Sequence, residues 1–297
     1  MIPACPRCGV GCSVKFGQFY REDDAQTIQR YRCKACGKSH SSATHTPTYR
    51  QKKRRLNRLV EKDIVSGSSQ RSIARKHGCA RKTVARKIAF LAERARVKLD
   101  HWLAQQQPFD HVQWDELITF EHSRLKPLSV AVMVAVEHGE LGVHRSIIGF
   151  GIAQIPASGL IAKRSVEKYG KRKDQSPSMR KQVLETVAPR LSPTVLIESD
   201  EHASYADELK QALPKSVHIQ HPSIRGSLSG QGELKRTGDD PLFTINHTLA
   251  MLRDNIKRLA RKTWCTTKRG NVLSDILAIY SHHHNTRLIT NPSKYQS

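Results

Sequence analysis

The sequence predicts a multidomain chain in which a small cysteine-bearing ribbon and a helical domain precede a larger α/β domain with a mixed sheet. Three observations lead to this prediction. Two Cys-x-x-Cys pairs lie within the first 36 residues, apolar residues recur at helical spacing between residues 56 and 98, and strand-like runs alternate with helical segments after residue 108. A chain of 297 residues is long enough for two or three domains, one of them with a sizeable core.

The charge of the chain is strongly positive and unevenly distributed. The formal net charge is +24 and the pI is near 10.1. Residues 1–108 carry 24 Lys and Arg against 7 Asp and Glu, whereas the remainder carries 26 against 19. Such an excess indicates a polyanionic partner that binds mainly the N-terminal part. No apolar run approaches the ~20 residues that span a bilayer, so we expect a cytoplasmic protein without a membrane partner.

The two cysteine pairs have the spacing of a metal site. Cys5 and Cys8 are separated from Cys33 and Cys36 by 24 residues, which can form a hairpin while the four thiolates close a tetrahedral Zn²⁺ site. A glycine follows each pair, where a tight turn with positive φ is useful. We therefore predict a zinc ribbon over residues 1–43 with one structural Zn²⁺. Two alternatives are open: two disulfides in place of the metal, and Cys12 as a substitute ligand.

A basic segment separates the ribbon from the helical domain. Residues 44–49 are typical of a linker, and residues 50–55 then place five cations in six positions. Directly before a helical pattern, such a run favours contacts with phosphates, and we assign that role to Arg54 and Arg55. The alternative is a solvated surface.

Three helices are predicted in a domain over residues 50–100. Apolar residues recur at helical spacing from Leu56 to Ile64, and Gly67 ends this first helix. Ser68 or Ser69 can cap a short second helix. A turn at residues 77–79 then leads to a third helix from residue 81.

The stretch SQRSIARKHGCARKTVARKI resembles the helix-turn-helix of resolvases and transposases. Ile73, Val84 and Ile88 fit the apolar core of such a unit. The resemblance implies that the third helix enters the major groove of double-stranded DNA with outward-facing cations, namely Arg81, Lys82, Arg86 and Lys87. A basic helical hairpin without a DNA-reading role is the alternative.

Residues 108–290 alternate between strand-like and helical patterns. Strands are predicted at 112–120, 128–136, 142–150, 194–200 and 217–219, the second of them apolar enough to be fully buried. Helices are predicted at 177–190, 203–213 and 248–262, the last of them strongly basic. The order of these elements matches the RNase H fold, so we predict an α/β RNase H-like domain with a mixed sheet.

Two aspartates interrupt the apolar strands of this domain. Asp115 lies within the first strand and Asp200 ends the fourth. A carboxylate in an apolar strand costs free energy unless it is paired or bound to a metal. On neighbouring parallel strands both would point to one edge of the sheet, where carboxylates can hold the two divalent metals of phosphoryl transfer on DNA. The adjacent Glu116 would point to the opposite face.

The layout of these acids resembles the DDE-type transposases of small bacterial insertion sequences, which carry a zinc ribbon and a helix-turn-helix. The segments QWDELITF and IESDEHASY resemble the surroundings of the first two acids, and FTINHTLAMLRDNIKRLARKTW resembles the helix that carries the third. The resemblance implies that Asp115, Asp200 and Asn246 hold two catalytic Mg²⁺ ions, with Arg253 seven residues after the asparagine.

The third ligand is where the sequence departs from the commoner pattern of the family. Asparagine stands in place of glutamate, and its carbonyl oxygen can bind Mg²⁺ but supplies no charge. Glu233, Asp239 and Asp240 on the preceding Gly-rich loop are alternative third ligands.

Several other residues have simpler interpretations. Lys257 and Arg261 belong to a basic run that we expect to contact the DNA backbone beside the catalytic centre. Trp114 and Trp264 are expected in the core, and residues 282–284, all histidine, in a surface tail.

Together these features favour an insertion-sequence transposase that binds terminal inverted repeats and catalyses Mg²⁺-dependent DNA end cleavage and strand transfer. The resemblance implies a homo-oligomer on paired DNA ends, associated with the bacterial nucleoid. The alternative is a catalytically inactive, transposase-derived DNA-binding regulator.

Overall fold

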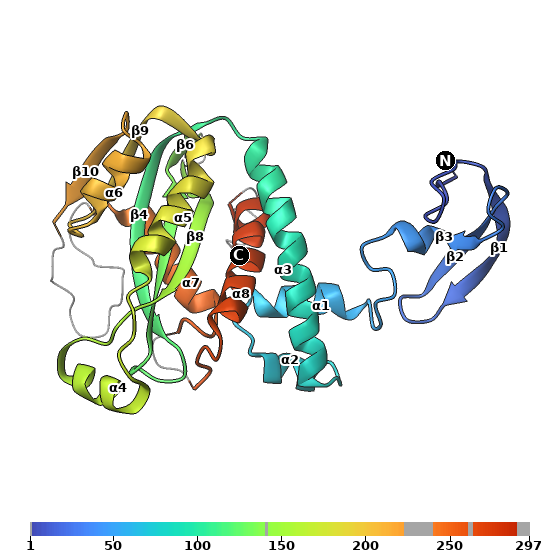
Figure 1. Cartoon of the computed structure of the whole chain (residues 1–297), viewed down its shortest axis with the longest axis horizontal. Coiled ribbons are helices and arrows are strands. Elements are labelled where there is room, and N and C mark those ends of the chain that lie inside the picture. The colour runs from blue at the N-terminus through green and yellow to red at the C-terminus, as the bar shows by residue number, and fades with distance from the viewer. Residues whose placement is uncertain (1, 140–141, 223–239, 261–263, 290–297) are drawn as a thin grey trace. The chain divides into compact units, whose positions relative to one another are not determined.

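The computed structural model describes residues 2–139, 142–222, 240–260 and 264–289, with only the backbone described at 138, 139 and 142–144. The chain divides into two compact units, Met1–Val60 and Glu61–Ser297 (Figure 1). The division falls within helix α1 (Leu56–Ile64). The domain boundaries predicted from the sequence stay predictions. No helix among the described residues is long and apolar enough to span a bilayer.

The N-terminal unit is built on a three-stranded antiparallel sheet in the order β1 (Ser13–Arg21), β2 (Gln26–Cys33) and β3 (Ser39–Ser41), followed by the 3-10 helix η1 (Ser42–His45). Most of β1 is exposed, and the buried part of the sheet is centred on His40, on which Tyr31 stacks and to which the Ser13 hydroxyl hydrogen-bonds at 2.9 Å. Strands β1 and β2 connect the first cysteine pair to the second, and β2 ends at Cys33.

The larger unit begins with two helices joined by a short turn, α2 (Gln70–Lys76) and α3 (Arg81–Ala104). The Ser69 side chain accepts a hydrogen bond from the Ser72 amide and so caps α2, as one of the two predicted caps would. The predicted apolar residues Ile73, Val84 and Ile88 are all buried.

A mixed sheet forms the core of the larger unit, as predicted. Its strands lie in the order β10 (Val217–His221), β9 (Leu191–Asp200), β4 (Phe109–Phe120), β5 (Pro127–Ala135) and β8 (Ile147–Gln154). Strand β9 runs parallel to β4 and β10, whereas β5 is antiparallel to β4 and β8. Every residue of β5 is buried. The predicted strand 142–150 is in fact two strands, because β7 (Gly142–His144) pairs with β6 (Glu137–Gly139) in a separate hairpin.

Helices cover both faces of this sheet. Trp114 of β4 packs against Tyr205 of α6 (Tyr205–Ala212), while the neighbouring Gln113 hydrogen-bonds α7 (Phe243–Asn255). Because successive side chains of a strand point to opposite faces, α6 and α7 lie on opposite sides of β4. Helix α5 (Ser176–Val187) joins the apolar core on the Trp114 face. The remaining helical elements are α4 (Ala162–Tyr169), α8 (Gly270–His283) and three short turns, η2 (Gly159–Ile161), η3 (Ala188–Arg190) and η4 (His284–Leu288).

The basic helix predicted at 248–262 is wrong in its position. Helix α7 begins at Phe243 and ends at Asn255, whose carbonyl oxygen accepts a hydrogen bond from the Gly67 amide at 2.9 Å. After Asn255 the chain leaves the helical path, and Ile256 and Leu259 are both buried. A tertiary contact and apolar burial therefore end the helix earlier than the local pattern indicates.

Three single-residue expectations are also wrong. Lys87 is 3% exposed and faces inward, because it lies between the buried Val84 and Ile88 on the packed side of α3. Trp264 is fully exposed, although Trp114 is buried as predicted. The histidines at 282–284 close α8, and His284 is buried with its Nε2 donating to the Arg145 carbonyl at 2.8 Å.

Candidate functional site

Four cysteine side chains converge in the N-terminal unit. The Sγ atoms of Cys5 and Cys36 are 3.6 Å apart, those of Cys8 and Cys33 are also 3.6 Å apart, and all four lie within 4.8 Å of one another. A zinc–sulfur distance of about 2.3 Å in a tetrahedron gives sulfur–sulfur edges of roughly 3.8 Å, so the donor set fits such an ion. The predicted alternative of two disulfides is wrong because none of the four cysteines of the two pairs forms a disulfide.

The backbone forms a tight turn after each pair of cysteines. The Gly9 and Gly37 amides donate to the carbonyls of Cys5 and Cys33 at 2.9 and 3.0 Å, and both glycines have the positive φ that the sequence predicts, +73° and +68°. Backbone amides in the second knuckle, above all that of Cys36, lower the pKa of the Cys33 thiol to about 6. The four cysteines can therefore bind a metal. Cys12 also lies close, with its Sγ 3.9 Å from that of Cys33.

Asp115 and Asp200 lie on the neighbouring strands β4 and β9 of the larger sheet. Gln113 of β4 stands opposite Glu198 of β9 in the parallel register, and their side chains hydrogen-bond at 2.9 Å. The next residue on the same face of each strand is two positions further along, which is Asp115 on β4 and Asp200 on β9. The two carboxylates therefore lie on adjacent strands, on one face, at the carboxyl end of β9.

The two aspartates differ in their surroundings. Asp115 Oδ1 accepts a hydrogen bond from the Glu116 amide at 2.6 Å. Asp200 Oδ1 is buried and has no hydrogen-bond partner among the described residues. Burial is the main reason why the pKa of Asp200 lies above its ordinary value, and the negative charges of Glu116 and Glu201 act in the same direction. A buried carboxylate oxygen without a donor is what a cation would stabilise.

Helix α7 brings the predicted third ligand to the same face of β4. Asn246 Nδ2 donates to Asp240 Oδ2 at 2.8 Å, and Asp240 Oδ1 accepts from the Leu242 amide at 3.0 Å. Because a carboxylate only accepts, the amide nitrogen of Asn246 must face Asp240, and its carbonyl oxygen is the atom left for a cation. Arg253 lies near the end of α7 and donates to the Leu259 carbonyl. Of the alternative third ligands, Glu233 and Asp239 lie outside the described residues.

Sequence reasoning missed a buried polar cluster on the same face of the sheet. Its central residues, Gln113 and Glu198, precede Asp115 and Asp200 by two residues on their strands. Glu198 accepts hydrogen bonds from Gln113 at 2.9 Å, from His111 Nε2 at 2.7 Å and from His221 Nε2 at 2.9 Å. Burial acts to raise the pKa of Glu198, but these three contacts outweigh it and hold the pKa below its ordinary value. The sequence gives little signal for this cluster, because the alternation of β4 places Gln113 on the same face as the polar His111 and Asp115.

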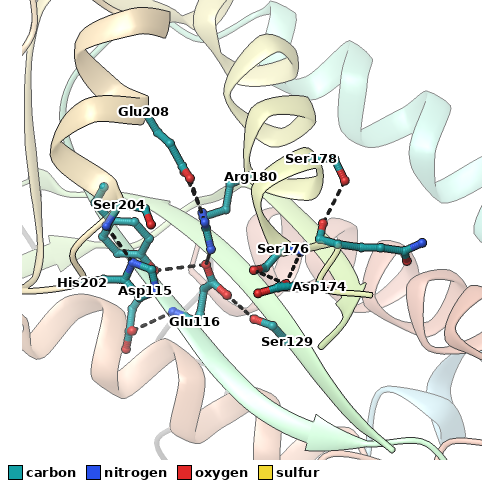
Figure 2. Close-up of polar contacts among 12 residues, drawn as sticks. Asp115, Glu116, Ser129, Asp174, Ser176, Ser178, Arg180, His202, Ser204 and Glu208 are labelled. Carbon is teal, nitrogen blue, oxygen red and sulfur yellow. Dashed lines mark hydrogen bonds and ion pairs between the residues drawn. The ribbon is translucent and has the colours of Figure 1, made fainter. Parts of the chain in front are cut away.

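A second missed cluster lies on the opposite face of β4, centred on Glu116 (Figure 2). Arg180 of α5 donates from Nη1 to Glu116 Oε1 at 3.1 Å. Its Nε and Nη2 form a bidentate ion pair with the Glu208 carboxylate of α6, at 2.6 and 2.7 Å. Glu116 also accepts from the Ser129 and Tyr205 hydroxyls. The prediction that Glu116 points away from Asp115 is confirmed. Its charge is matched by Arg180, so it is committed to the packing of α5 and α6.

The residues predicted to contact DNA are placed differently from one another. Arg81, Lys82 and Arg86 are exposed on the first turns of α3, unlike the buried Lys87. Arg54 bonds Asp23 within the N-terminal unit at 3.2 Å, while Arg55 is exposed. Lys257 is exposed, and Arg261 lies outside the described residues.

Among the described residues, the four cysteines are the one group of three or more His, Cys, Asp or Glu side chains whose ligand atoms converge tightly enough for a metal ion. The site on β4 and β9 thus offers two carboxylates, Asp115 and Asp200. A third protein ligand would come from an amide, such as that of Asn246.

No protein-family profile matches the sequence, and no curated protein matches it either. The solved structures that align with the fold include two complexes of Mos1. The crystal structure of the Mos1 strand transfer complex does so with a TM-score of 0.33 and 11% identity, over 82% of this chain and 75% of that chain. The crystal structure of a pre-cleavage Mos1 transpososome does so with a TM-score of 0.21 and 10% identity, over 85% of this chain and 80% of that chain. At these TM-scores the likeness carries no argument about function, which rests on the site itself.

Proposed function

We propose that this chain is a DNA transposase that cleaves the ends of its element and joins them to target DNA in a Mg²⁺-dependent reaction. The observation that carries the proposal is the pairing of Asp115 and Asp200 on one face of adjacent parallel strands, with Asp200 Oδ1 buried and without a donor. The strand order β10-β9-β4-β5-β8, with the first acid on the central strand, supports an RNase H-like core.

Asp115, Asp200 and the carbonyl oxygen of Asn246 would hold the Mg²⁺ ions, which supply a charged centre for the attacking and leaving oxygens of an in-line displacement. The residues of the chain orient this centre. The Glu116 amide fixes one oxygen of Asp115, and Asp240 fixes the amide plane of Asn246. Oxygen ligands of this kind suit Mg²⁺ better than a softer metal.

DNA recognition falls to the N-terminal part of the chain in this proposal. The α2–turn–α3 unit would act as a helix-turn-helix, with Arg81, Lys82 and Arg86 at the major groove. Residues 1–60 carry thirteen Lys and Arg against three acids, a net charge of +10 that suits the phosphate backbone. A structural Zn²⁺ on the four cysteines would hold the ribbon. Transposition requires two DNA ends in one complex, so we propose a homo-oligomer that acts in the bacterial cytoplasm.

Cleavage of DNA that carries the element's own ends, with Mg²⁺ added, tests the catalytic proposal. Asp115→Asn and Asp200→Asn should each reduce the cleavage rate about a thousandfold or more and leave end binding intact. Asn246→Ala should be similarly impaired, while Asn246→Asp should retain activity. Full cleavage activity in Asp200→Asn would refute the proposal that this site catalyses the reaction.

The binding proposal has a matched control in the same chain. Replacing Arg81 and Arg86 with alanine should reduce the preference for end DNA over random DNA. Replacing Lys52 and Lys53, which are equally exposed, should weaken binding to both DNAs alike. Equal effects of the two pairs would argue against α3 as the reading helix.

A DNA-binding regulator with an inactive core is the second candidate. The observation that favours it is the asparagine at position 246, which leaves two carboxylates where the commoner site has three. End binding without any Mg²⁺- or Mn²⁺-dependent cleavage would establish the regulator.

A further inference from the structure

We propose that Gln113 is a positioning residue that holds the first turn of α7 against strand β4, beside Asp115 and Asp200. In this way it sets the position of the third metal ligand. This inference rests on the proposed function and deepens it. Gln113 precedes Asp115 by two residues on the same face of β4, and its side chain is 2% exposed.

The amide of Gln113 has three partners on two other segments of the chain, strand β9 and the start of α7. Its Nε2 donates to Glu198 Oε2 at 2.9 Å and to the Pro241 carbonyl at 2.7 Å, and its Oε1 accepts from the Ile245 amide at 2.9 Å. Both amide hydrogens and the oxygen are therefore used, and the orientation of the group is fixed by its partners.

The contact with Ile245 replaces a missing helix cap. The first amides of a helix have no partner within it, and the residue before α7, Leu242, has no side chain that could cap them. Gln113 takes the Ile245 amide and Asp240 takes the Leu242 amide, so α7 is capped partly from β4. Asn246 is the next residue after Ile245, so the hydrogen bond from the Ile245 amide to Gln113 ties the backbone beside Asn246 to β4.

Glu198 holds Gln113 from the other side. It lies two residues before Asp200 on β9 and is itself fixed by His111 on β4 and His221 on β10. The cluster thus joins the strand of each aspartate to the helix of the asparagine without using any of the three proposed ligands. Partners of this outer kind orient ligands, and their loss costs ten- to a hundredfold in metal affinity or activity.

Binding of Mn²⁺ to the full-length protein, followed by the electron paramagnetic resonance of the free ion, separates positioning from simple stability. Gln113→Met keeps the size of the side chain and removes its hydrogen bonds, and it should weaken Mn²⁺ binding about tenfold or more. Asn285→Leu is the matched control, because Asn285 is also a fully buried amide that bonds the backbone, at Ile147, but it lies on η4 away from the aspartates. It should leave Mn²⁺ binding unchanged.

A charge-exchanged pair provides the rescue. Gln113→Glu alone places two carboxylates against each other and should weaken Mn²⁺ binding, whereas adding Glu198→Gln restores a donor between the strands and should recover part of the affinity. Unchanged Mn²⁺ binding in Gln113→Met, or an equal loss of Mn²⁺ affinity in Asn285→Leu, would overturn the role of Gln113 but not the proposed metal site. Mn²⁺ binding that survives Asp200→Asn would overturn the proposed site itself, and the inference with it.

Discussion

Replacing Arg180 with methionine should destabilise the larger unit strongly, because it removes the cation from a buried ionic cluster. The Arg180 side chain is 3% exposed, and its partners Glu116 and Glu208 are 11% and 23% exposed. Burial acts to lower the pKa of Arg180, but the contacts with Glu208 and Glu116 outweigh it and keep the guanidinium charged. Without it, two carboxylates face each other in a poorly solvated space.

The size of the effect follows from which carboxylate can return to water. Removing one partner of a buried ion pair costs about 3–5 kcal/mol. Glu208 can rehydrate and Glu116 keeps the Ser129 and Tyr205 hydroxyls, so we expect the lower end, about 3 kcal/mol. For a unit of this size that is a fall in Tm of roughly 6–12 °C, which thermal unfolding followed by circular dichroism measures.

Two variants make the reasoning refutable. Arg190→Met removes an arginine whose partner, Asp100, is 70% exposed, and it should cost less than about 1 kcal/mol. Adding Glu116→Gln and Glu208→Gln to Arg180→Met removes the stranded charges and should recover most of the loss. Equal losses for the two arginine variants, or no recovery in the triple variant, would show that the charges of this cluster do not control the stability.

Three further predictions concern other parts of the chain. Cys33→Ser should remove the bound zinc, measured by elemental analysis, while the larger unit keeps its unfolding temperature; retention of stoichiometric zinc would contradict the ligand set. Asp200→Asn should raise the unfolding free energy by about 1 kcal/mol at neutral pH in metal-free buffer, because it neutralises a carboxylate whose buried Oδ1 has no donor among the described residues; a loss of stability would contradict this. Asp63→Asn should lower stability by about 1–3 kcal/mol at neutral pH, since Asp63 is buried and bonds Lys76 and His77 at 2.7 and 2.6 Å. Burial opposes the charge of Asp63, but these contacts lower its pKa, so its contribution is complete above the ordinary aspartate pKa of about 3.9 and is lost as pH falls through the folded pKa; a difference between wild type and Asp63→Asn that does not shrink as the pH is lowered below the ordinary aspartate pKa would refute the assignment.

Features that depend on local spacing could be predicted from the sequence. The cysteine pairs and their glycines specify two tight knuckles whatever surrounds them, and the structure brings their four sulfurs together. The period of two along a strand likewise places Asp115 and Glu116 on opposite faces, because backbone geometry alone decides it. The apolar run of β5 is short and rich in valine, which favours a buried strand over a buried helix.

Only the tertiary structure decided features whose partners are distant along the chain. Gln113 is 85 residues from Glu198 and 132 from Ile245, so no local pattern reveals that a buried glutamine caps a helix. The end of α7 at Asn255, the inward turn of Lys87 and the burial of His284 have the same origin, because each depends on which distant surface the element packs against. Propensity and period describe a segment by itself, whereas burial and hydrogen-bond satisfaction are properties of the assembled fold.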